Sequence, residues 1–311
     1  MLMFQMSNAA EGLKYLDLPT EKRNPLSADL HLLSATQIIE LINKADAIAI
    51  DEAAKQSANV AQLVEAGIAA IHAGGSIHYF GAGTSGRIAT QDAAELYPTF
   101  HSPAHAVVAH MAGGPAALLT SVENAEDDFD AGRLDASKLG PNDLAIGLAA
   151  SGRTPYVGGA LEMARTLGAK TALIACVPSP QLEKYSDITI AGDTGPEILT
   201  GSTRLKAGTF QKAVLSSFST AMMVGLGKTY SNLMVSMVAT NEKLHSRSIR
   251  ILMEGSGVKQ GEAVSLLEQS SGDLKLALTA AISGQAPNDV SAALEEAGGV
   301  VQKALEKIKQ R

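Results

Sequence analysis

Hydrophobic residues follow two different spacings along this chain. Between residues 34 and 74 apolar side chains recur every three or four positions, as at Val60, Leu63 and Val64, which predicts helices that pack one face on a core. Short apolar runs then alternate with helical patterns. The expected strands are 76–80, 105–110, 143–149, 171–177 and 188–191, and the expected helices are 85–96, 115–133 and 155–167. This order is typical of an α/β fold, with a doubly wound parallel sheet flanked by helices.

The two ends of the chain follow other patterns. Residues 1 to about 30 contain the helix breakers Pro19 and Pro25, so an irregular arm is expected there. A long helical tract, interrupted at 225–227, is expected over 205–245, and its methionines are more typical of core or dimer packing than of a ligand site. The last segment predicts a small bundle of short helices. We therefore expect an arm and helix in 1–50, the main domain in 51–245 and a small C-terminal helical bundle in 246–311.

Composition and charge exclude several classes of protein. Of the 311 residues 46% are hydrophobic and 18% charged, as in a globular enzyme, and the net charge is -7. With that charge and only 4% aromatic residues, no nucleic-acid partner is expected. No apolar stretch is long enough to span a membrane and no signal peptide is evident, so a cytoplasmic location is expected. The histidines lack metal-site spacing, so no metal is expected, and Cys176 lies in an apolar run typical of a buried, inert thiol.

The most informative segment is the turn that follows the first expected strand. Residues 81–87 read Gly-Ala-Gly-Thr-Ser-Gly-Arg and lead into a helix, so backbone amides together with Gly83, Thr84 and Ser85 can surround an anion. The lysine of a nucleotide-binding P-loop is missing. The spacing fits a loose dinucleotide-binding motif, but the two hydroxyl groups favour a phosphate monoester over a pyrophosphate.

Two further polar segments have similar chemistry. Residues 149–155 again join a strand to a helix, and the candidate phosphate or sugar contacts there are Ser151, Gly152, Arg153 and Thr154. Two such turns at the ends of parallel strands can meet at one ligand, where the strand order reverses. Segment 200–209 offers Ser202, Arg204 and Lys206. Its pattern fits a ligand contact and a capped helix start equally well.

Two carboxylates stand out among the acidic residues. Glu95 follows the first glycine-rich turn on the same expected helix, and Glu123 lies in the acidic segment 121–128. Either could supply acid or base catalysis, but glutamates in helices are more often solvated surface residues. Their spacing alone does not distinguish the two possibilities.

These loops resemble those of a known family of the sugar isomerase (SIS) fold, the N-acetylmuramic acid 6-phosphate etherases. The similar segments span roughly residues 20–250, and segment 195–209 is especially specific. They are Thr20–Asn24, Gly81–Arg87, Asp92–Glu95, Pro98–Thr99, Val122–Asp127, Ala150–Val157, Gly195–Lys212 and Ala239–His245. The last helices resemble the small ubiquitin-associated (UBA-like) bundle of such etherases.

The resemblance implies a lyase of carbohydrate metabolism. It would cleave the D-lactyl ether of N-acetylmuramic acid 6-phosphate, without a cofactor, during peptidoglycan recycling and amino sugar catabolism. Glu95 matches the family's acid, and Glu123 matches the second glutamate, the expected base. One departure is Asn124, where the family usually has glycine, and activity is still expected. The resemblance leaves open a non-catalytic sugar-phosphate regulator, similar to glucokinase regulatory protein, and a phosphosugar isomerase.

The position of Glu95 raises a geometric difficulty. Ten residues of helix separate it from Ser85, which corresponds to about 15 Å at about 1.5 Å per residue, farther than a hexose phosphate reaches. Either the helix bends across the site or a second subunit completes it. A homodimer with its site near the subunit interface is therefore expected.

Overall fold

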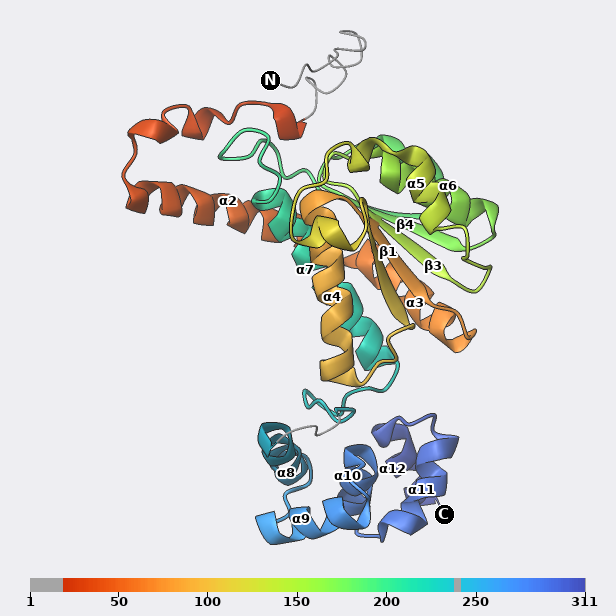
Figure 1. Ribbon diagram of the computed structural model, residues 1–311. Helices are drawn as coiled ribbons and strands as arrows, with labels where there is room; N and C mark the ends of the chain where they lie inside the picture. Colours follow the sequence, from red (N-terminus) through yellow and green to blue (C-terminus); the bar gives the residue numbers. More distant parts are fainter. Residues whose placement is uncertain (1–18, 238–241, 311) are drawn as a thin grey trace. The chain divides into compact units, whose positions relative to one another are not determined.

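A five-stranded sheet organises the main part of the protein, as the sequence pattern predicts. The computed structural model describes residues 19–237 and 242–310 (Figure 1). The strands are β1 Ile77–Gly81, β2 Val107–Met111, β3 Leu144–Leu148, β4 Lys170–Ala175 and β5 Ile188–Ala191. Their order is β2-β1-β3-β4-β5, and the pairs β1–β3, β3–β4 and β4–β5 are parallel. The expected α/β sheet is confirmed.

The strand order reverses direction between β1 and β3. From β1 the chain moves outward to β2, whereas β3, β4 and β5 follow one another on the other side. In the register of the pair, Gly81 at the end of β1 faces Leu148 at the end of β3. The turns after these two strands therefore begin side by side, at the edge where open α/β sheets bind their ligands.

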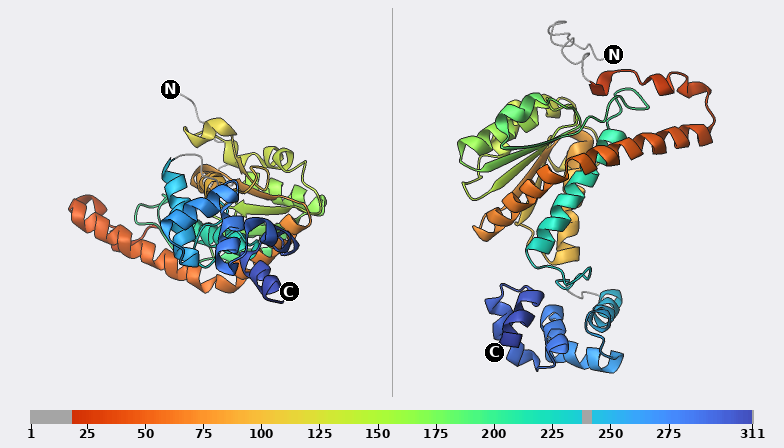
Figure 2. Two further views of the ribbon diagram at one scale, coloured as in Figure 1. Left: turned by 90° about the horizontal axis from the view of Figure 1, so that it is seen from below. Right: turned by 180° about the vertical axis from the view of Figure 1, so that it is seen from behind.

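Helices cover both faces of this sheet. Helix α6 (Pro155–Thr166) packs on β3 and β4 beside α5 (Phe129–Asp135), and α3 (Ser57–His72) contacts β5, β1 and β3 (Figures 1 and 2). The core between α6 and the sheet includes Phe80, Tyr156 and Leu173. Helix α4 (Gly83–Phe100) follows β1 directly, and α7 (Lys206–Gly225) follows the loop after β5.

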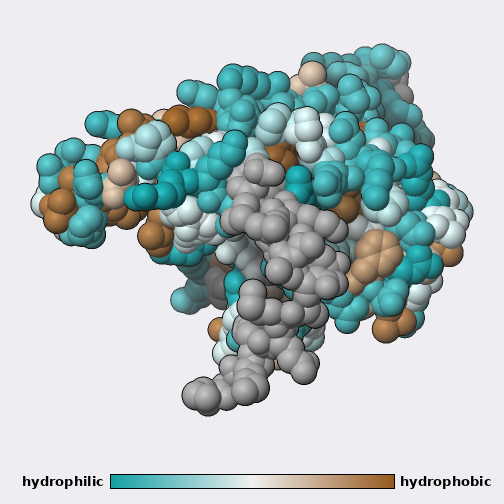
Figure 3. Space-filling view, turned by 90° about the horizontal axis from the view of Figure 1, so that it is seen from above, coloured by the Kyte–Doolittle hydropathy of each residue, from teal (hydrophilic) through white to brown (hydrophobic). Residues whose placement is uncertain are grey.

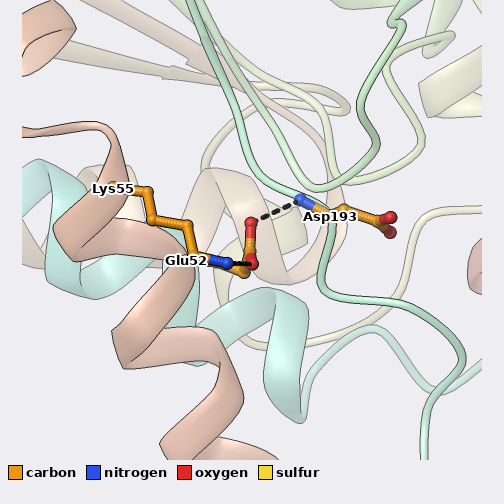
Figure 4. A network of polar contacts seen from close by, with 3 residues as sticks. All are labelled: Glu52, Lys55 and Asp193. Atoms are coloured by element: carbon orange, nitrogen blue, oxygen red, sulfur yellow. Dashed lines mark hydrogen bonds and ion pairs between the residues drawn. The ribbon is translucent and has the colours of Figure 1, made fainter.

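The N-terminal arm ends in a long helix. In the described part of the arm, from Pro19 on, three short 3-10 turns, η2 (Pro19–Glu21), η3 (Pro25–Ser27) and η4 (Leu30–Leu32), precede α2 (Ala35–Lys55). Ser34 and Gln37 form a capping box that fixes where α2 begins. At its other end Glu52 binds Lys55 Nζ at 2.5 Å and accepts a 3.1 Å hydrogen bond from the backbone N–H of Asp193 (Figure 4). The bond from Asp193 joins α2 to the loop after β5. Residues 1–18 of the expected arm lie outside the described residues.

The expected continuous helix over 115–133 is wrong. The segment contains η5 (Pro115–Leu118), an irregular stretch, η6 (Ala125–Asp127) and only then α5. Asn124 has a left-handed backbone, with φ of 59°, which no α-helix accommodates. Asp128 then caps α5 by accepting a hydrogen bond from the N–H of Ala131. The apolar periodicity spans these breaks without revealing them.

The expected helical tract over 205–245 is only partly correct. Helix α7 ends at Gly225, as the glycines there predict, but described residues 226–237 form turns, and helix resumes with α8 (Glu242–Ser256). Met222, Met223 and Met237 are buried, in agreement with a packing role. Residues 239–241 of the similar segment 239–245 lie outside the described residues.

A bundle of short helices ends the chain, as expected. After α8 come α9 (Gln260–Gln269), α10 (Leu274–Ser283), α11 (Pro287–Glu296) and α12 (Val301–Gln310). Leu252, Leu278 and Val301 are fully buried in its core. By contacts the chain forms two compact units, one of residues up to Asp92 and Val108–Phe218, the other of Ala93–Val107 and from Ser219 onward. Within the described ranges no helix is long and apolar enough to cross a membrane.

Candidate active site

Three loops that are far apart in sequence line one cavity of about 340 Å³. The first follows β1, the second follows β3 and the third precedes α7, so the predicted meeting of the turns is observed. The N-terminal arm and residues Glu126 and Asp127 complete the wall. The lining residues are Thr20, Glu21, Ala82, Gly83, Thr84, Ser85, Glu126, Asp127, Ala150, Ser151, Thr154, Pro155, Gly201 and Thr203. We call this space the phosphate cavity.

The first turn supplies the phosphate cavity with groups suited to an anion. Gly83 begins α4 with φ of 54°, so the first amides of the helix follow immediately after β1. Thr84 and Ser85 lie in that first turn and line the cavity. Free N–H groups at a helix start carry partial positive charge and attract phosphate. The hydroxyl of Ser85 donates a 2.8 Å hydrogen bond to Oε1 of the buried Gln211 on α7.

The second turn presents hydroxyl groups from the neighbouring strand end. Ser151 and Thr154 line the phosphate cavity, and Thr154 occupies the position before α6 without capping it through its side chain. Gly152 is buried beneath the turn with φ of 65°, against Pro180, and Arg153 is half-buried. Neither Gly152 nor Arg153 belongs to the described lining. Gly152 therefore shapes the turn through its backbone.

The third loop contributes residues other than those singled out from sequence. Gly201 and Thr203 line the phosphate cavity, whereas Ser202, Arg204 and Lys206 lie outside its described lining. Lys206 is buried, and its Nζ donates a hydrogen bond to the carbonyl oxygen of Thr194 at 2.5 Å. Burial lowers the pKa of Lys206, although the charge of Glu197 opposes this effect. The ammonium group therefore holds the loop rather than reaching the cavity.

The same loop is fixed by a buried carboxylate and by the arm. Glu197 accepts hydrogen bonds from the backbone N–H groups of Lys206 and Ala207, at 3.0 and 2.9 Å, and so caps α7. Asn24 Nδ2 donates to the carbonyl oxygen of Pro196 at 3.0 Å, and Ser27 donates to that of Ile198 at 2.7 Å. These bonds bring Thr20 and Glu21 to the phosphate cavity. Sequence reasoning placed the segment 20–24 in the family pattern without assigning it to the site.

A second cavity, of about 400 Å³, adjoins the first along the loop after β2. It shares Ala82, Gly83, Glu126 and Asp127 with the phosphate cavity, and Arg87 and Glu123 line it as well. We call it the acidic cavity. A ligand whose phosphate sits at Gly83 can therefore extend towards carboxylate side chains.

Glu126 is the carboxylate that the sequence reasoning missed as a candidate. It lines both cavities together with Asp127, whereas Glu123 lines the acidic cavity alone. Although the residue as a whole is exposed, partial enclosure of its carboxyl group raises the pKa of Glu126, and the charges of Asp127 and Glu21 raise it further. The sequence signal that could have identified Glu126 is its position three residues after Glu123, inside the family-like segment 122–127.

The departure at Asn124 has a structural explanation. Its left-handed backbone conformation is one that glycine adopts without strain and that asparagine tolerates better than most residues. The loop that carries Glu123 and Glu126 can therefore keep its shape with asparagine at this position.

Glu95 lies in the last third of helix α4. Helix α4 continues without a break from Gly83 to Phe100, and Glu95 is exposed on it. It is not among the described residues that line either cavity.

Comparison with known proteins places this geometry in a family. The sequence model of the glucokinase regulatory protein N-terminal SIS domain matches residues 59–165. N-acetylmuramic acid 6-phosphate etherase of Thermobifida fusca is 51% identical over 260 residues, covering 84% of this chain and 86% of that protein. The enzymes of the same name from Salmonella typhi and Geobacillus thermodenitrificans are 45% and 44% identical, each covering 93% of this chain.

Among solved structures, a phosphoheptose isomerase from Francisella tularensis shares the fold. It superposes with a TM-score of 0.50 at 18% identity, covering 62% of this chain and 100% of the isomerase. That likeness supports the SIS-type sheet. The etherases extend over most of the chain, whereas the regulatory-protein match covers only residues 59–165. The chain belongs to the N-acetylmuramic acid 6-phosphate etherase family.

Proposed function

We propose that this protein is a carbon–oxygen lyase that cleaves the D-lactyl ether of N-acetylmuramic acid 6-phosphate. The products are N-acetylglucosamine 6-phosphate and D-lactate, which places the reaction in amino-sugar recycling. Besides family membership, one structural observation supports the proposal: three loops form the phosphate cavity, which adjoins a second cavity lined by carboxylates. Phosphate held at Gly83 and Ser85 directs the attached sugar towards the acidic cavity.

The chemistry follows from the substrate. When the sugar ring opens, carbon 1 becomes an aldehyde and the proton on carbon 2 becomes acidic. A carboxylate base can remove that proton, and the electron pair then expels the lactyl oxygen from carbon 3 as an acid donates a proton to it. Water adds to carbon 3 of the unsaturated aldehyde, and a proton returns to carbon 2. The net change consumes one water and needs no oxidant or cofactor.

The carboxylates in the acidic cavity are the candidates for the base. Glu123 is proposed for this role from its family match, but the geometry favours Glu126. Glu126 lines both cavities, which supports a base that would lie beside both the phosphate and the sugar carbons. A raised pKa also makes Glu126 a stronger base than an ordinary carboxylate.

Glu95 is proposed as the acid that protonates the departing lactate and later activates the water. Its separation from Ser85 along α4, about 15 Å, supports a site completed by a second subunit. The projecting arm and α2 offer a surface for such a partner (Figures 1 and 3). Three apolar side chains of the arm and α2, those of Leu26, Leu32 and Ile39, are 72%, 72% and 57% exposed. Figure 3 shows hydrophobic atoms along this part of the surface. A cytoplasmic homodimer is thus part of the proposal.

The direct test is an assay of D-lactate released from N-acetylmuramic acid 6-phosphate. We expect the parent protein to release lactate, and Glu95→Gln and Glu126→Gln to lose at least about a hundredfold in kcat, the usual contribution of acid or base catalysis. Glu123→Gln decides between the two candidate bases. A larger loss of kcat in Glu123→Gln than in Glu126→Gln would identify Glu123 as the base. No lactate from the folded parent protein would reject the lyase.

A further inference from the structure

Gln211 is buried beneath the phosphate cavity and makes only one of its possible hydrogen bonds. The residue is 1% exposed on α7, and its Oε1 accepts the hydroxyl proton of Ser85 at 2.8 Å. Its Nε2 is buried with no hydrogen-bond partner in the described structure. A buried amide group without an acceptor is destabilising, so this orphan requires an explanation.

The bond as it stands conflicts with phosphate binding by Ser85. A serine hydroxyl has one proton, and here that proton points to Gln211. At pH 8 the three unprotonated oxygens of inorganic phosphate only accept, as do the terminal oxygens of a sugar phosphate dianion, so Ser85 has no proton to donate to them in this arrangement. The family pattern and the cavity lining nevertheless support the proposed contact between Ser85 and phosphate.

Rotation of the Gln211 amide removes the conflict at Ser85 and gives Nε2 a partner, and it leaves the carbonyl oxygen Oε1 in the buried position without one. The oxygen and the NH2 group of a primary amide are similar in size, so a half-turn about χ3 exchanges them with little change in packing. Nε2 would then donate to the hydroxyl oxygen of Ser85, and the serine proton would be released towards the cavity. We infer that Gln211 is a positioning residue, whose amide turns when phosphate binds and thereby makes Ser85 a hydrogen-bond donor to the ligand.

This inference rests on the proposed phosphate site, but it is independent of the lactate chemistry. It concerns a phosphoryl group in the cavity, and inorganic phosphate is a sufficient probe. Binding of phosphate can therefore support or overturn it even if lactate release fails.

Two substitutions of similar length separate the possible roles of Gln211. In Gln211→Glu the ionised carboxylate only accepts, so it keeps the serine proton. In Gln211→Met no acceptor is present, so Ser85 remains free to donate. We expect Gln211→Glu to raise the Kd of inorganic phosphate at pH 8 roughly tenfold or more, and Gln211→Met to raise it less than Ser85→Ala does.

The added negative charge of Gln211→Glu is controlled by a double-mutant cycle. Each Gln211 variant is combined with Ser85→Ala, and phosphate binding is measured by titration calorimetry with the unfolding midpoint followed in parallel. We expect the Gln211→Glu penalty to shrink at least threefold without the serine hydroxyl. The same penalty in both backgrounds would overturn the inference, because Gln211 would then act without Ser85. The inference would also be overturned if Gln211→Met bound phosphate as weakly as Ser85→Ala. This second comparison can be made even if Gln211→Glu does not fold.

Discussion

Arg87 Nη2 donates a 2.8 Å hydrogen bond to the carbonyl oxygen of Ala117, and so ties helix α4 to the loop that carries the acidic residues. Its Nε makes a second bond, of 3.0 Å, to the carbonyl oxygen of Leu118. Two parallel bonds from one planar guanidinium group fix orientation as well as distance. The loop between β2 and α5 has little regular structure; the clamp holds it at η5, ahead of Glu123, whereas η6 with Glu126 packs against α6.

We predict that breaking this clamp lowers turnover more than it weakens phosphate binding. Arg87→Met and Arg87→Lys should each reduce kcat at least about tenfold, because misplacing a catalytic group by about 1 Å costs up to a hundredfold. The Kd of inorganic phosphate should change less than about threefold. Arg165→Met is the matched control, since Arg165 also donates to a carbonyl oxygen, that of Lys184, on the exposed side of α6. Equal losses in both variants would show that the clamp has no special role.

The raised pKa of Glu126 predicts a pH dependence with a definite sign. A general base must be ionised, so kcat/KM should fall as the pH drops through the pKa of Glu126, which lies above the ordinary carboxyl value of 4.5. Glu21→Gln removes one of the negative charges that raise this pKa. The acidic limb of the profile should therefore move to lower pH in that variant. A limb that stays in place would show that Glu126 is not the titrating group.

Two glycines of the site are predicted to differ in their tolerance of a side chain. A Cβ at Gly152 would lie 2.3 Å from Cβ and 2.8 Å from Cα of Pro180, whereas a Cβ at Gly83 meets nothing within 4 Å. Both residues have positive φ, so Gly83→Ala should cost about 1–2 kcal/mol of unfolding free energy through the backbone alone. Gly152→Ala adds the steric clash and should cost roughly 1–3 kcal/mol more. Denaturant unfolding measures the difference, and equal losses would contradict the packing described for Gly152.

A pair of histidines predicts acid sensitivity of the fold. His78 Nδ1 on β1 lies 2.9 Å from His110 Nε2 on β2, and the His110 ring stacks on Phe80. Burial, and then the charge of His78, lower the pKa of His110 to about 4, although Asp135 opposes the shift. In the unfolded chain an imidazole takes up its proton near pH 6.5. The unfolded state thus binds more protons between pH 6.5 and about 4, so stability falls as the pH drops through this range.

His110→Phe should remove this contribution to the pH dependence of stability. The unfolding midpoint of this variant should fall less between pH 7 and pH 4.5 than that of the parent protein. His105→Phe changes an exposed histidine and should leave the parent's acid dependence unaltered. If His110→Phe and the parent protein lost stability equally, the acid sensitivity would arise elsewhere.

The sequence was sufficient to predict the sheet and the meeting of its loops. Apolar runs mark the central strands β1 and β3 because they are largely buried on both faces, and the glycine and hydroxyl residues of the turns that follow are evident in the sequence. The helix expected over 115–133 was wrong, because one left-handed residue, Asn124, divides a segment whose periodicity looks continuous. The spacing of apolar residues predicts which side chains share a face, but it does not show where the backbone adopts a left-handed conformation.

Contacts between distant segments were beyond the reach of sequence pattern. Lys206 resembles a phosphate ligand in the sequence, but its side chain is buried and its ammonium group donates a hydrogen bond to the carbonyl oxygen of Thr194. Glu126 looks like one of several acids in a solvated run until the loop places it between two cavities. Gln211 carries no signal of its own, since its role depends on a partner 126 residues away in the chain.

The fate of the water oxygen tests the proposed lyase most directly. N-acetylmuramic acid 6-phosphate is incubated with the protein in water enriched in oxygen-18, and both products are analysed by mass spectrometry under conditions that limit exchange at the sugar aldehyde. Elimination followed by hydration breaks the bond between carbon 3 and the ether oxygen, so carbon 3 of N-acetylglucosamine 6-phosphate should carry the label and the lactate hydroxyl should not. Label in the lactate hydroxyl, with none at carbon 3, would mean that the bond breaks on the lactate side and would contradict the mechanism.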